Sequence, residues 1–288
     1  MPAYRGSCFH PLSEKNSLPE LPEVETTLRG ISPCITGKTV RKVIIRDGRL
    51  RWPVPRQLNK YLSGETIMHV KRRGKYLLIN TASGTMIIHL GMSGNLRITD
   101  ASQKADKHDH VDILFENNTC LRFHDPRRFG CVLWTKKDPL EHKLLSSLGV
   151  EPLDNNFTGE YLYDRSRGKK VAIKPFLMNS KIVVGVGNIY ASEALFLAGI
   201  HPLRSASRIS SNRYEQLAKI IKQVLRSAIK QGGTTLRDFV SSEGKPGYFK
   251  QQLNVYGREG EACTVCDTPI KQIRQGQRST YYCPQCQR

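Results

Sequence analysis

The stretch Leu18-Pro19-Glu20-Leu21-Pro22-Glu23-Val24-Glu25 decides how the chain begins to fold, because it marks the start of the first long helix. Pro22 suits the first turn of a helix, where its missing N–H costs no hydrogen bond. Acidic residues in that turn favour the positive end of the helix dipole. The stretch therefore predicts a helix that begins near Pro22. Its apolar residues recur at helical spacing: Leu21, Val24, Leu28 and Ile31.

Pro19 and Glu20, just ahead of this helix, have two interpretations. The first is an ordinary helix cap. The second requires Pro19 to be a chain terminus, where a secondary amine with a pKa near ~8 is partly neutral at pH 7. Such an amine can attack a sugar aldehyde carbon to form a Schiff base, and a neighbouring carboxylic acid can donate the proton that opens the sugar.

The composition indicates a polyanionic partner. Lysine and arginine outnumber the acidic residues 45 to 25, which gives a net charge of +20 over 288 residues. Nucleic acid is the polyanion that this excess favours, although a ribosomal or membrane-surface protein would share the charge. No run approaches the ~20 apolar residues of a membrane span, so we expect no membrane association. The length suits two domains.

Four of the eight cysteines form two CxxC pairs, Cys263-x2-Cys266 and Cys283-x2-Cys286, separated by sixteen residues. This spacing fits a tetrahedral zinc site, with two disulfides or a redox CxxC as the alternatives. Residues 1–18 lack the apolar core of a signal peptide, so we expect a cytoplasmic protein with reduced thiols. Four thiolates leave no open position for water, and one structural Zn²⁺ per chain is therefore predicted.

The segment between the two cysteine pairs predicts a β-hairpin. Gly276 lies near its middle, with Arg274 and Arg278 on or near the tip. We expect the hairpin to place Arg278 on DNA.

The first half of the chain after the helix predicts strands. The segments are short, rich in Val and Ile, and bounded by Gly or Asn turns, which favours an antiparallel sandwich in an α+β protein. The expected strands are residues 39–46, 66–71, 75–80, 85–90, 111–116, 119–124 and 130–134.

After Leu148-Gly149-Val150-Glu151-Pro152 the composition changes and helices are expected. Asp154–Gly168 has the composition of a linker, and residues 241–251 have that of a second one. Gly185-Val186-Gly187-Asn188 opens a helix that is expected to reach Ala198, and Tyr214–Gln231 is strongly amphipathic. These shifts divide the chain into units at 19–150, 151–250 and 251–288, with residues 1–18 outside them.

The stretch Pro19-Glu20-Leu21-Pro22-Glu23-Val24-Glu25-Thr26 resembles the mature N-terminus of bacterial formamidopyrimidine-DNA glycosylases, and the similarity continues to the C-terminus. The resemblance implies an N-terminal antiparallel β-sandwich with flanking helices, followed by a helix–two-turn–helix domain and a zinc β-hairpin. It implies a monomeric base excision repair enzyme that acts on double-stranded DNA containing oxidised purines. Such enzymes release 8-oxoguanine or formamidopyrimidines and then cut the strand by β,δ-elimination.

The same resemblance implies catalytic roles for four residues. Pro19 would attack the glycosidic carbon, and Glu20 would protonate the sugar ring oxygen. Lys75, at the end of the basic turn Arg72-Arg73-Gly74-Lys75, would transfer a proton in β-elimination. Arg278 would contact the phosphates of the damaged nucleotide and serve δ-elimination.

DNA contacts are also implied. Met92, Arg127 and Phe129 would fill the gap left by the extruded base, with Arg127 reading the orphaned cytosine. From the residues alone, Met92 is more typical of core packing, Phe129 fits core packing equally well, and the turn that ends at Lys75 fits a solvated face equally well. The implied contacts to the DNA backbone are His108, Lys169, Lys174 and Asn188.

Two rival functions remain at this point. A non-catalytic zinc-hairpin DNA-binding protein would explain the charge and the cysteines, but not the acid-rich Pro-Glu stretch. An endonuclease VIII-like enzyme would act on oxidised pyrimidines instead. That group typically has a different residue where Leu21 stands, which favours the purine-lesion branch.

Residues 1–18 bear on the mechanism directly. As written, the Pro19 nitrogen is in a peptide bond with Leu18, and a tertiary amide nitrogen cannot form a Schiff base. We expect translation to start at Leu18, read as methionine from a codon such as UUG and then removed. A cleaved or silencing extension is the alternative. The polar composition of residues 1–18 predicts disorder.

Overall fold

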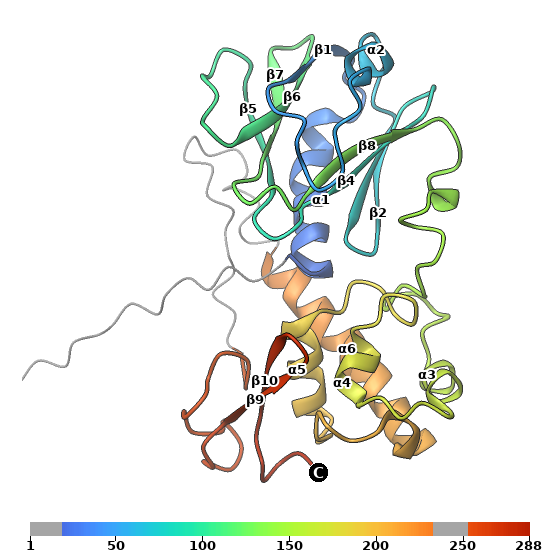
Figure 1. Ribbon diagram of the computed structural model, residues 1–288, viewed down its shortest axis with the longest axis vertical. Coiled ribbons are helices and arrows are strands. Elements are labelled where there is room, and N and C mark those ends of the chain that lie inside the picture. The colour runs from blue at the N-terminus through green and yellow to red at the C-terminus, as the bar shows by residue number, and fades with distance from the viewer. Residues whose placement is uncertain (1–18, 233–252) are drawn as a thin grey trace, which may run out of the picture.

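The structure is a computed structural model that describes residues 19–232 and 253–288. Two lobes are joined at a waist, with the helix α1 reaching down into the waist from the upper lobe and α6 reaching up from the lower one (Figure 1). The predictions for residues 1–18 and for the linker at 241–251 lie outside the described residues.

Helix α1 spans Leu21–Ile35, and Glu20 is its N-cap. The predicted start near Pro22 is confirmed. Leu21 and Ile31 are fully buried and Val24 nearly so, which accounts for the apolar spacing seen in the sequence.

The upper lobe holds two four-stranded antiparallel sheets with the strand orders β1-β6-β7-β5 and β2-β3-β4-β8. Side chains from both sheets and from α1 form one apolar core, so the predicted sandwich is confirmed. The short helix α2 (Leu58–Leu62) and the 3-10 helix η1 (Pro139–Glu141) complete the lobe. The strands are β1 Val40–Ile45, β2 His69–Arg73, β3 Tyr76–Asn80, β4 Thr85–His89, β5 Asn95–Asp100, β6 Asp109–Phe115, β7 Thr119–His124 and β8 Cys131–Thr135.

Strand β5 was not among the strands expected from the sequence. It lies at the end of its sheet's strand order and pairs with β7 alone. Only Leu96 of its six residues is buried, since the rest of the strand is partly or fully open to solvent. An edge strand with one buried side chain contains too few apolar residues for a strand to be predicted from its own sequence.

The lower lobe is helical and has its own core. Its helices are α3 Gly159–Ser166, α4 Ile173–Leu177, α5 Asn188–Leu197, η2 Ala206–Arg208 and α6 Ser211–Gly232. No helix among residues 19–232 and 253–288 is both long enough and apolar enough to cross a bilayer.

Helix α3 lies inside Asp154–Gly168, so the prediction of a linker there was wrong. Thr158 caps the helix by accepting a hydrogen bond from the Tyr161 N–H, and Leu162 is fully buried. Gly159 packs against α6 so closely that a side chain there would overlap the backbone of Glu215. The helix therefore depends on a long-range contact made through a glycine, which local composition does not reveal.

The predicted C-terminal hairpin is confirmed as β9 (Lys271–Gln275) paired with β10 (Arg278–Tyr282). Gly276 in its turn has a φ of +57°, a conformation that favours glycine. The hairpin lies beside α5 (Figure 1). The Glu193 carboxylate of α5 fixes the chain leading to the hairpin by accepting hydrogen bonds from the N–H groups of residues 254–256.

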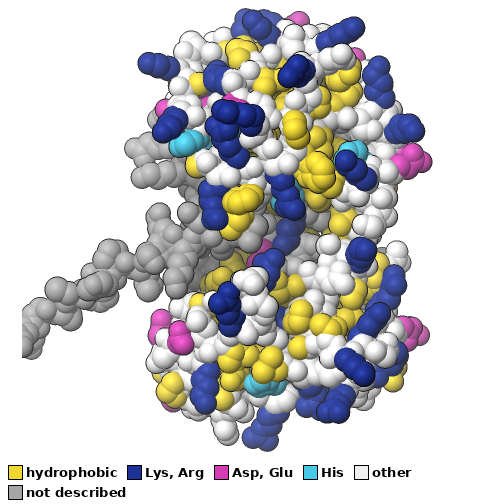
Figure 2. All heavy atoms as spheres, viewed as in Figure 1, with side chains coloured by type: hydrophobic (Ala, Val, Ile, Leu, Met, Phe, Trp, Pro, Cys, Tyr) yellow, Lys and Arg dark blue, Asp and Glu magenta, His cyan; other side chains and the backbone are white. Residues whose placement is uncertain are grey.

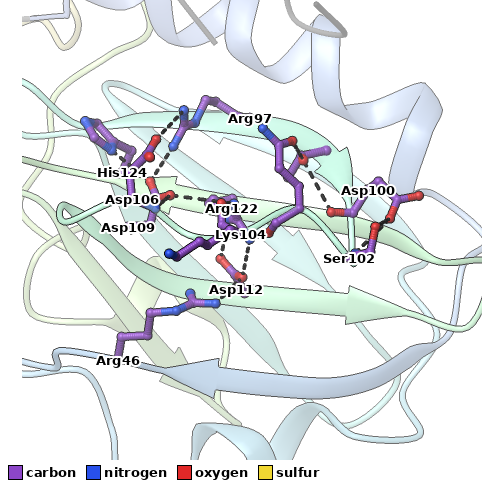
Figure 3. Close-up of polar contacts among 12 residues, drawn as sticks. Arg46, Arg97, Asp100, Ser102, Lys104, Asp106, Asp109, Asp112, Arg122 and His124 are labelled. Carbon is purple, nitrogen blue, oxygen red and sulfur yellow. Dashed lines mark hydrogen bonds and ion pairs between the residues drawn. The ribbon is translucent and has the colours of Figure 1, made fainter. Parts of the chain in front are cut away.

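A buried charge network ties together the sheet β1-β6-β7-β5 (Figure 3). The Arg122 side chain is 3% exposed and donates two hydrogen bonds to Asp112, at 2.9 and 2.8 Å. It also donates to the carbonyl oxygens of Gln103 and Lys104, which holds the loop after β5 against the sheet. Asp109, on β6, accepts from His124 and from Arg97.

Replacing Arg122 should strongly destabilise the upper lobe. Arg122→Ala would leave the buried Asp112 carboxylate short of a partner, and breaking a buried ion pair typically costs about 3–5 kcal/mol. Urea unfolding followed by circular dichroism measures the change. The matched control is Arg49→Ala, because the Arg49 side chain is 82% exposed in its pair with Asp47, and exposed ion pairs contribute little to stability. Equal losses in the two variants would contradict a stabilising role for the network.

Candidate active site and zinc site

The Glu20 side chain lies where the two lobes meet. It is 2% exposed, although it belongs to the start of α1 in the upper lobe. Its carboxylate accepts hydrogen bonds from the N–H groups of Gly187 at 2.7 Å and Ile189 at 2.8 Å, at the N-terminus of α5. These N–H groups have no partner within their own helix, and the helix dipole favours a carboxylate there. One side chain thus caps a helix of the opposite lobe.

The glycines of the Gly185-Val186-Gly187 turn make room for this contact. A side chain at Gly187 would overlap the Glu20 carboxyl group. Gly185 has a φ of +80°, and its carbonyl accepts a hydrogen bond from the Leu21 N–H at 3.0 Å. The Gly-x-Gly pattern therefore brings the backbone of the lower lobe against the start of α1.

Glu23 forms a second buried carboxyl group beside the first. It accepts hydrogen bonds from the Glu20 N–H at 2.8 Å and from the Tyr190 hydroxyl at 2.6 Å. Burial raises the pKa of Glu23, with hydrogen bonds from Tyr190 and Glu20 opposing the shift. Sequence reasoning missed Tyr190, because its contact with Glu23 joins residues 167 positions apart.

Lys75 supplies the opposite charge in this cluster. Burial raises the pKa of Glu20, while the positive charge of Lys75 opposes the shift and the negative charge of Glu23 adds to it. Burial also lowers the pKa of Lys75, which Glu20 opposes and Arg278 reinforces. Compared with the same groups in water, Glu20 therefore keeps its proton to higher pH, and Lys75 loses its proton at lower pH. This is the arrangement expected for proton transfer.

A cavity of about 570 Å³ brings together three of the predicted site residues, Met92, Phe129 and Arg278. His89 also lines it, and its Nδ1 accepts a hydrogen bond from the Gly91 N–H at 2.9 Å. Burial, with the charges of Lys75 and Arg51, lowers the pKa of His89 to about 4. His89 is therefore neutral near pH 7. Its place in the cavity was not predicted from the sequence.

The loop that carries Arg127 and Phe129 is held in shape by Asp125. The Asp125 carboxylate accepts hydrogen bonds from the Ser93 hydroxyl and the Gly130 N–H, both at 2.7 Å. The ring of Phe129 is exposed, and the Arg127 guanidinium lies over it, 5.4 Å from its centroid. Core packing of Phe129, the alternative that the sequence left open, is therefore wrong, and both side chains are free to meet a ligand.

The residues predicted to contact the DNA backbone lie in different environments. Lys169 is exposed, and His108 is half-buried with its ring edge-on to that of His124. Asn188 donates a hydrogen bond to the Ser279 carbonyl at 3.0 Å. Figure 2 shows Lys and Arg side chains over both lobes and along the hollow between them.

Lys174 differs from the other predicted contacts because it points inward. It is 1% exposed, and its Nζ donates to the Thr280 hydroxyl at 2.8 Å. Burial lowers the pKa of Lys174 to about 7, with Glu20 opposing the shift and Arg278 adding to it. Its partner belongs to the strand β10 that Arg278 begins, so Lys174 anchors the hairpin in this structure. Its contact with DNA stays a prediction.

The four cysteine sulfur atoms of the hairpin region fit one tetrahedral ion. All four lie within 4.8 Å of one another. The sulfur–sulfur distance is 3.9 Å for Cys263 and Cys286, 3.5 Å for Cys266 and Cys283, and 3.4 Å for Cys266 and Cys286. Zn–S bonds of ~2.3 Å in a tetrahedron place the sulfur atoms about 3.8 Å apart. Cys263 and Cys283 are buried in the small core of this region. The site therefore fits a structural zinc ion with no open position.

Three family models together match most of the chain. They are the formamidopyrimidine-DNA glycosylase N-terminal domain at residues 18–132, the H2TH domain of the same enzymes at 148–240, and a zinc finger found in FPG and IleRS at 260–288. A glycosylase N-terminal domain, an H2TH domain and a zinc finger in this order define the class, a zinc-containing DNA glycosylase. The chain belongs to the formamidopyrimidine-DNA glycosylase family.

Relatives from several bacteria support this assignment. The chain is 59% identical over 271 residues to the formamidopyrimidine-DNA glycosylase of Pseudomonas syringae pv. tomato, and 56% over 270 residues to that of Nitrosococcus oceani. Each match covers 94% of this chain and 100% of the relative.

Solved structures of a Lactococcus lactis enzyme have the same fold. One holds DNA with an abasic site, with a TM-score of 0.83, 32% identity, and coverage of 93% of this chain and 99% of that one. A mutant of the same enzyme holds DNA with Fapy-dG, with a TM-score of 0.85, 34% identity, and coverage of 94% and 100%.

Removing one zinc ligand should unfold the hairpin and abolish DNA binding, while the upper lobe stays folded. The physical reason is that so small a core depends on metal binding for its folding energy. Cys266→Ser tests this, with Cys34→Ser as the control because Cys34 lies on α1 away from the zinc site. Elemental analysis should find about one zinc per wild-type chain. A metal-free protein that still binds DNA would contradict the expectation.

Proposed function

We propose that this chain removes 8-oxoguanine and formamidopyrimidines from double-stranded DNA and then cuts the strand at the abasic site. Base excision repair of oxidised purines is the function of its family. The observation that carries the residue assignments is the buried Glu20 carboxyl group. It adjoins Pro19 in the chain and is electrostatically coupled to Lys75, which is coupled in turn to Arg278.

The first step joins the protein to the sugar. The damaged nucleotide leaves the stack, because its glycosidic carbon is unreachable inside the duplex. The Pro19 nitrogen attacks C1′, and the bond from C1′ to the base breaks, so that the base departs with the electron pair and takes up the proton that the amine loses. Glu20 then gives its proton to O4′ as the C1′–O4′ bond breaks. The raised pKa of Glu20 supports this role, since it keeps the acid protonated to higher pH.

The second step cleaves the strand. Loss of a C2′ proton from the imine breaks the bond from C3′ to its phosphate, and we assign this proton transfer to Lys75. We assign the following δ-elimination, at the 5′ phosphate, to Arg278, with a one-nucleoside gap as the result. Arg278 and Met92 line one cavity, which supports a damaged nucleotide at Arg278 beside the gap that Met92 fills.

The remaining assignments concern how the DNA is held. We assign Met92, Arg127 and Phe129 to the gap left by the extruded base, and the four-cysteine zinc site to holding the hairpin in place. The backbone contacts in this proposal are His108, Lys169, Lys174 and Asn188. The Lactococcus lactis complexes with abasic-site and Fapy-dG DNA support a duplex carrying a lesion as the partner.

The mechanism requires a free amine at Pro19, and borohydride trapping tests it. A protein that starts at Pro19 should give a covalent product with a duplex containing 8-oxoguanine. The 288-residue chain, verified uncleaved by intact mass, should give none, because an amide nitrogen forms no Schiff base. N-terminal sequencing of the natural protein identifies which form exists.

Equal trapping by both forms would show that Pro19 is not the nucleophile, and trapping by neither would favour a non-catalytic DNA-binding protein. A parallel panel of oxidised pyrimidines tests the endonuclease VIII-like alternative.

Lys75→Ala should slow strand cleavage at 8-oxoguanine more than release of the base, because the lysine serves elimination. Burial lowers the pKa of Lys75, so its neutral form is present at lower pH than for a solvated lysine. The wild-type rate of strand cleavage should therefore rise with pH and level off below pH 10.5, the usual pKa of lysine. Single-turnover assays that resolve both steps measure this. Equal loss of both steps would mean that Lys75 only positions DNA.

A further inference from the structure

The turn that precedes Lys75 is held by one carboxylate of the other lobe. Glu151 accepts hydrogen bonds from three consecutive residues of the β2–β3 turn. Its Oε2 accepts from Arg72 at 2.7 Å, and its Oε1 accepts from Arg73 at 3.0 Å and from the Gly74 N–H at 2.6 Å. The Glu151 side chain is only 13% exposed, so solvent screens these contacts weakly.

Glu151 is fixed to the lower lobe rather than to the sheet that it contacts. The residues just before it bond to that lobe, since the Gly149 N–H donates to Ser180 and the Val150 N–H to Ile182. Val184, two residues after the Ile182 that bonds to Val150, packs against Gly74 of the turn. A Cβ placed on Gly74 would be 3.1 Å from that of Val184.

The same turn is tied to the helix that carries the acid. The Arg72 guanidinium bridges Glu151 and Glu25, donating to the Glu25 carboxylate at 2.9 Å, and its side chain is 10% exposed. Glu25 lies on α1, five residues after Glu20. The Arg73 guanidinium adds a further contact between the turn and the segment before Glu151, because it donates to the carbonyl oxygens of Leu148 and Gly149.

Together these contacts decide where Lys75 lies. Gly74 has a φ of +58°, and its N–H bond to Glu151 fixes the residue immediately before Lys75. Movement of the turn would carry the Lys75 side chain away from Glu20. A misplacement of about 1 Å far from the reacting atoms can reduce a rate about 100-fold.

We propose that Glu151 is a positioning residue for Lys75, which makes the lyase step depend on the joint between the two lobes. This inference rests on the proposed function, because it assumes that Lys75 transfers a proton in strand cleavage. The simpler alternative is that Glu151 only balances the charge of Arg72 and stabilises the fold.

The test is a double-mutant cycle in the zinc-loaded protein with its natural N-terminus. Base release and strand cleavage are measured separately, under single-turnover conditions, on a duplex containing 8-oxoguanine. Glu151→Gln should slow strand cleavage about 10- to 100-fold, with a much smaller effect on base release. In the Lys75→Ala background, the same change should slow the residual strand cleavage no further, because the two residues act through one step.

The pH profile gives a second readout that a purely structural role would not move. If Lys75 leaves its buried position, its pKa returns toward that of a solvated lysine, and the rising limb of strand cleavage shifts to higher pH. Glu160→Gln is the matched control, because it removes the same charge from an exposed position on α3 of the same lobe. It should leave both steps and the pH profile unchanged.

Glu151→Asp keeps the inference testable if the first variant folds poorly. It keeps the charge but shortens the reach by one methylene, so a smaller loss confined to strand cleavage is expected. The inference is overturned if Glu151→Gln slows strand cleavage by the same factor with and without Lys75, or slows both steps equally. If Lys75→Ala alone leaves strand cleavage intact, the proposed role of Lys75 in strand cleavage is refuted instead. This result differs from those that refute the positioning role of Glu151, so the two proposals are tested separately.

Discussion

The structure depends most on the hydrogen bonds that the Glu20 carboxylate accepts from the N-terminus of α5. They join the first helix of the upper lobe to the lower lobe, and they bury the carboxyl group that the proposed chemistry uses as an acid. The glycines of the turn before α5 allow this approach, since a side chain at Gly187 would occupy the place of the carboxylate. Assembly of the two lobes therefore buries Glu20, and this burial raises its pKa although the hydrogen bonds from Ile189 and Gly187 oppose the shift.

Residues around this contact divide between those that react and those that hold the others in place. Lys174 and Glu193 fix the hairpin to the lower lobe, and Glu151 holds the turn before Lys75. Each is a charged group that is at least half-buried and is used in bonds within the protein. Of the three, Lys174 is the basic residue, and its burial shows that the lysines and arginines of the chain are not all at the surface.

The sequence predicted those features that local patterns carry. The start of α1, seven strands, the amphipathic α6 and the zinc hairpin follow from proline, apolar spacing, β-branched runs and cysteine spacing. Strand β5 was missed because it pairs with β7 alone. Helix α3 was missed because it depends on the close contact of Gly159 with α6. The inward direction of Lys174 and the contacts of Glu23 with Tyr190 and of Glu151 with the turn before Lys75 could not be predicted, since these partners are distant in sequence.

The two lobes have separate apolar cores, and this has a consequence for the order in which the protein is made. The upper lobe leaves the ribosome first and can bury its own core before α5 exists. In that interval Glu20 meets water and is an ordinary ionised carboxylate. A chain caught at this stage has Glu20 and Lys75 but lacks the buried acid that donates the proton. Synthesis of the lower lobe then buries Glu20, and this burial is what raises the pKa of the acid.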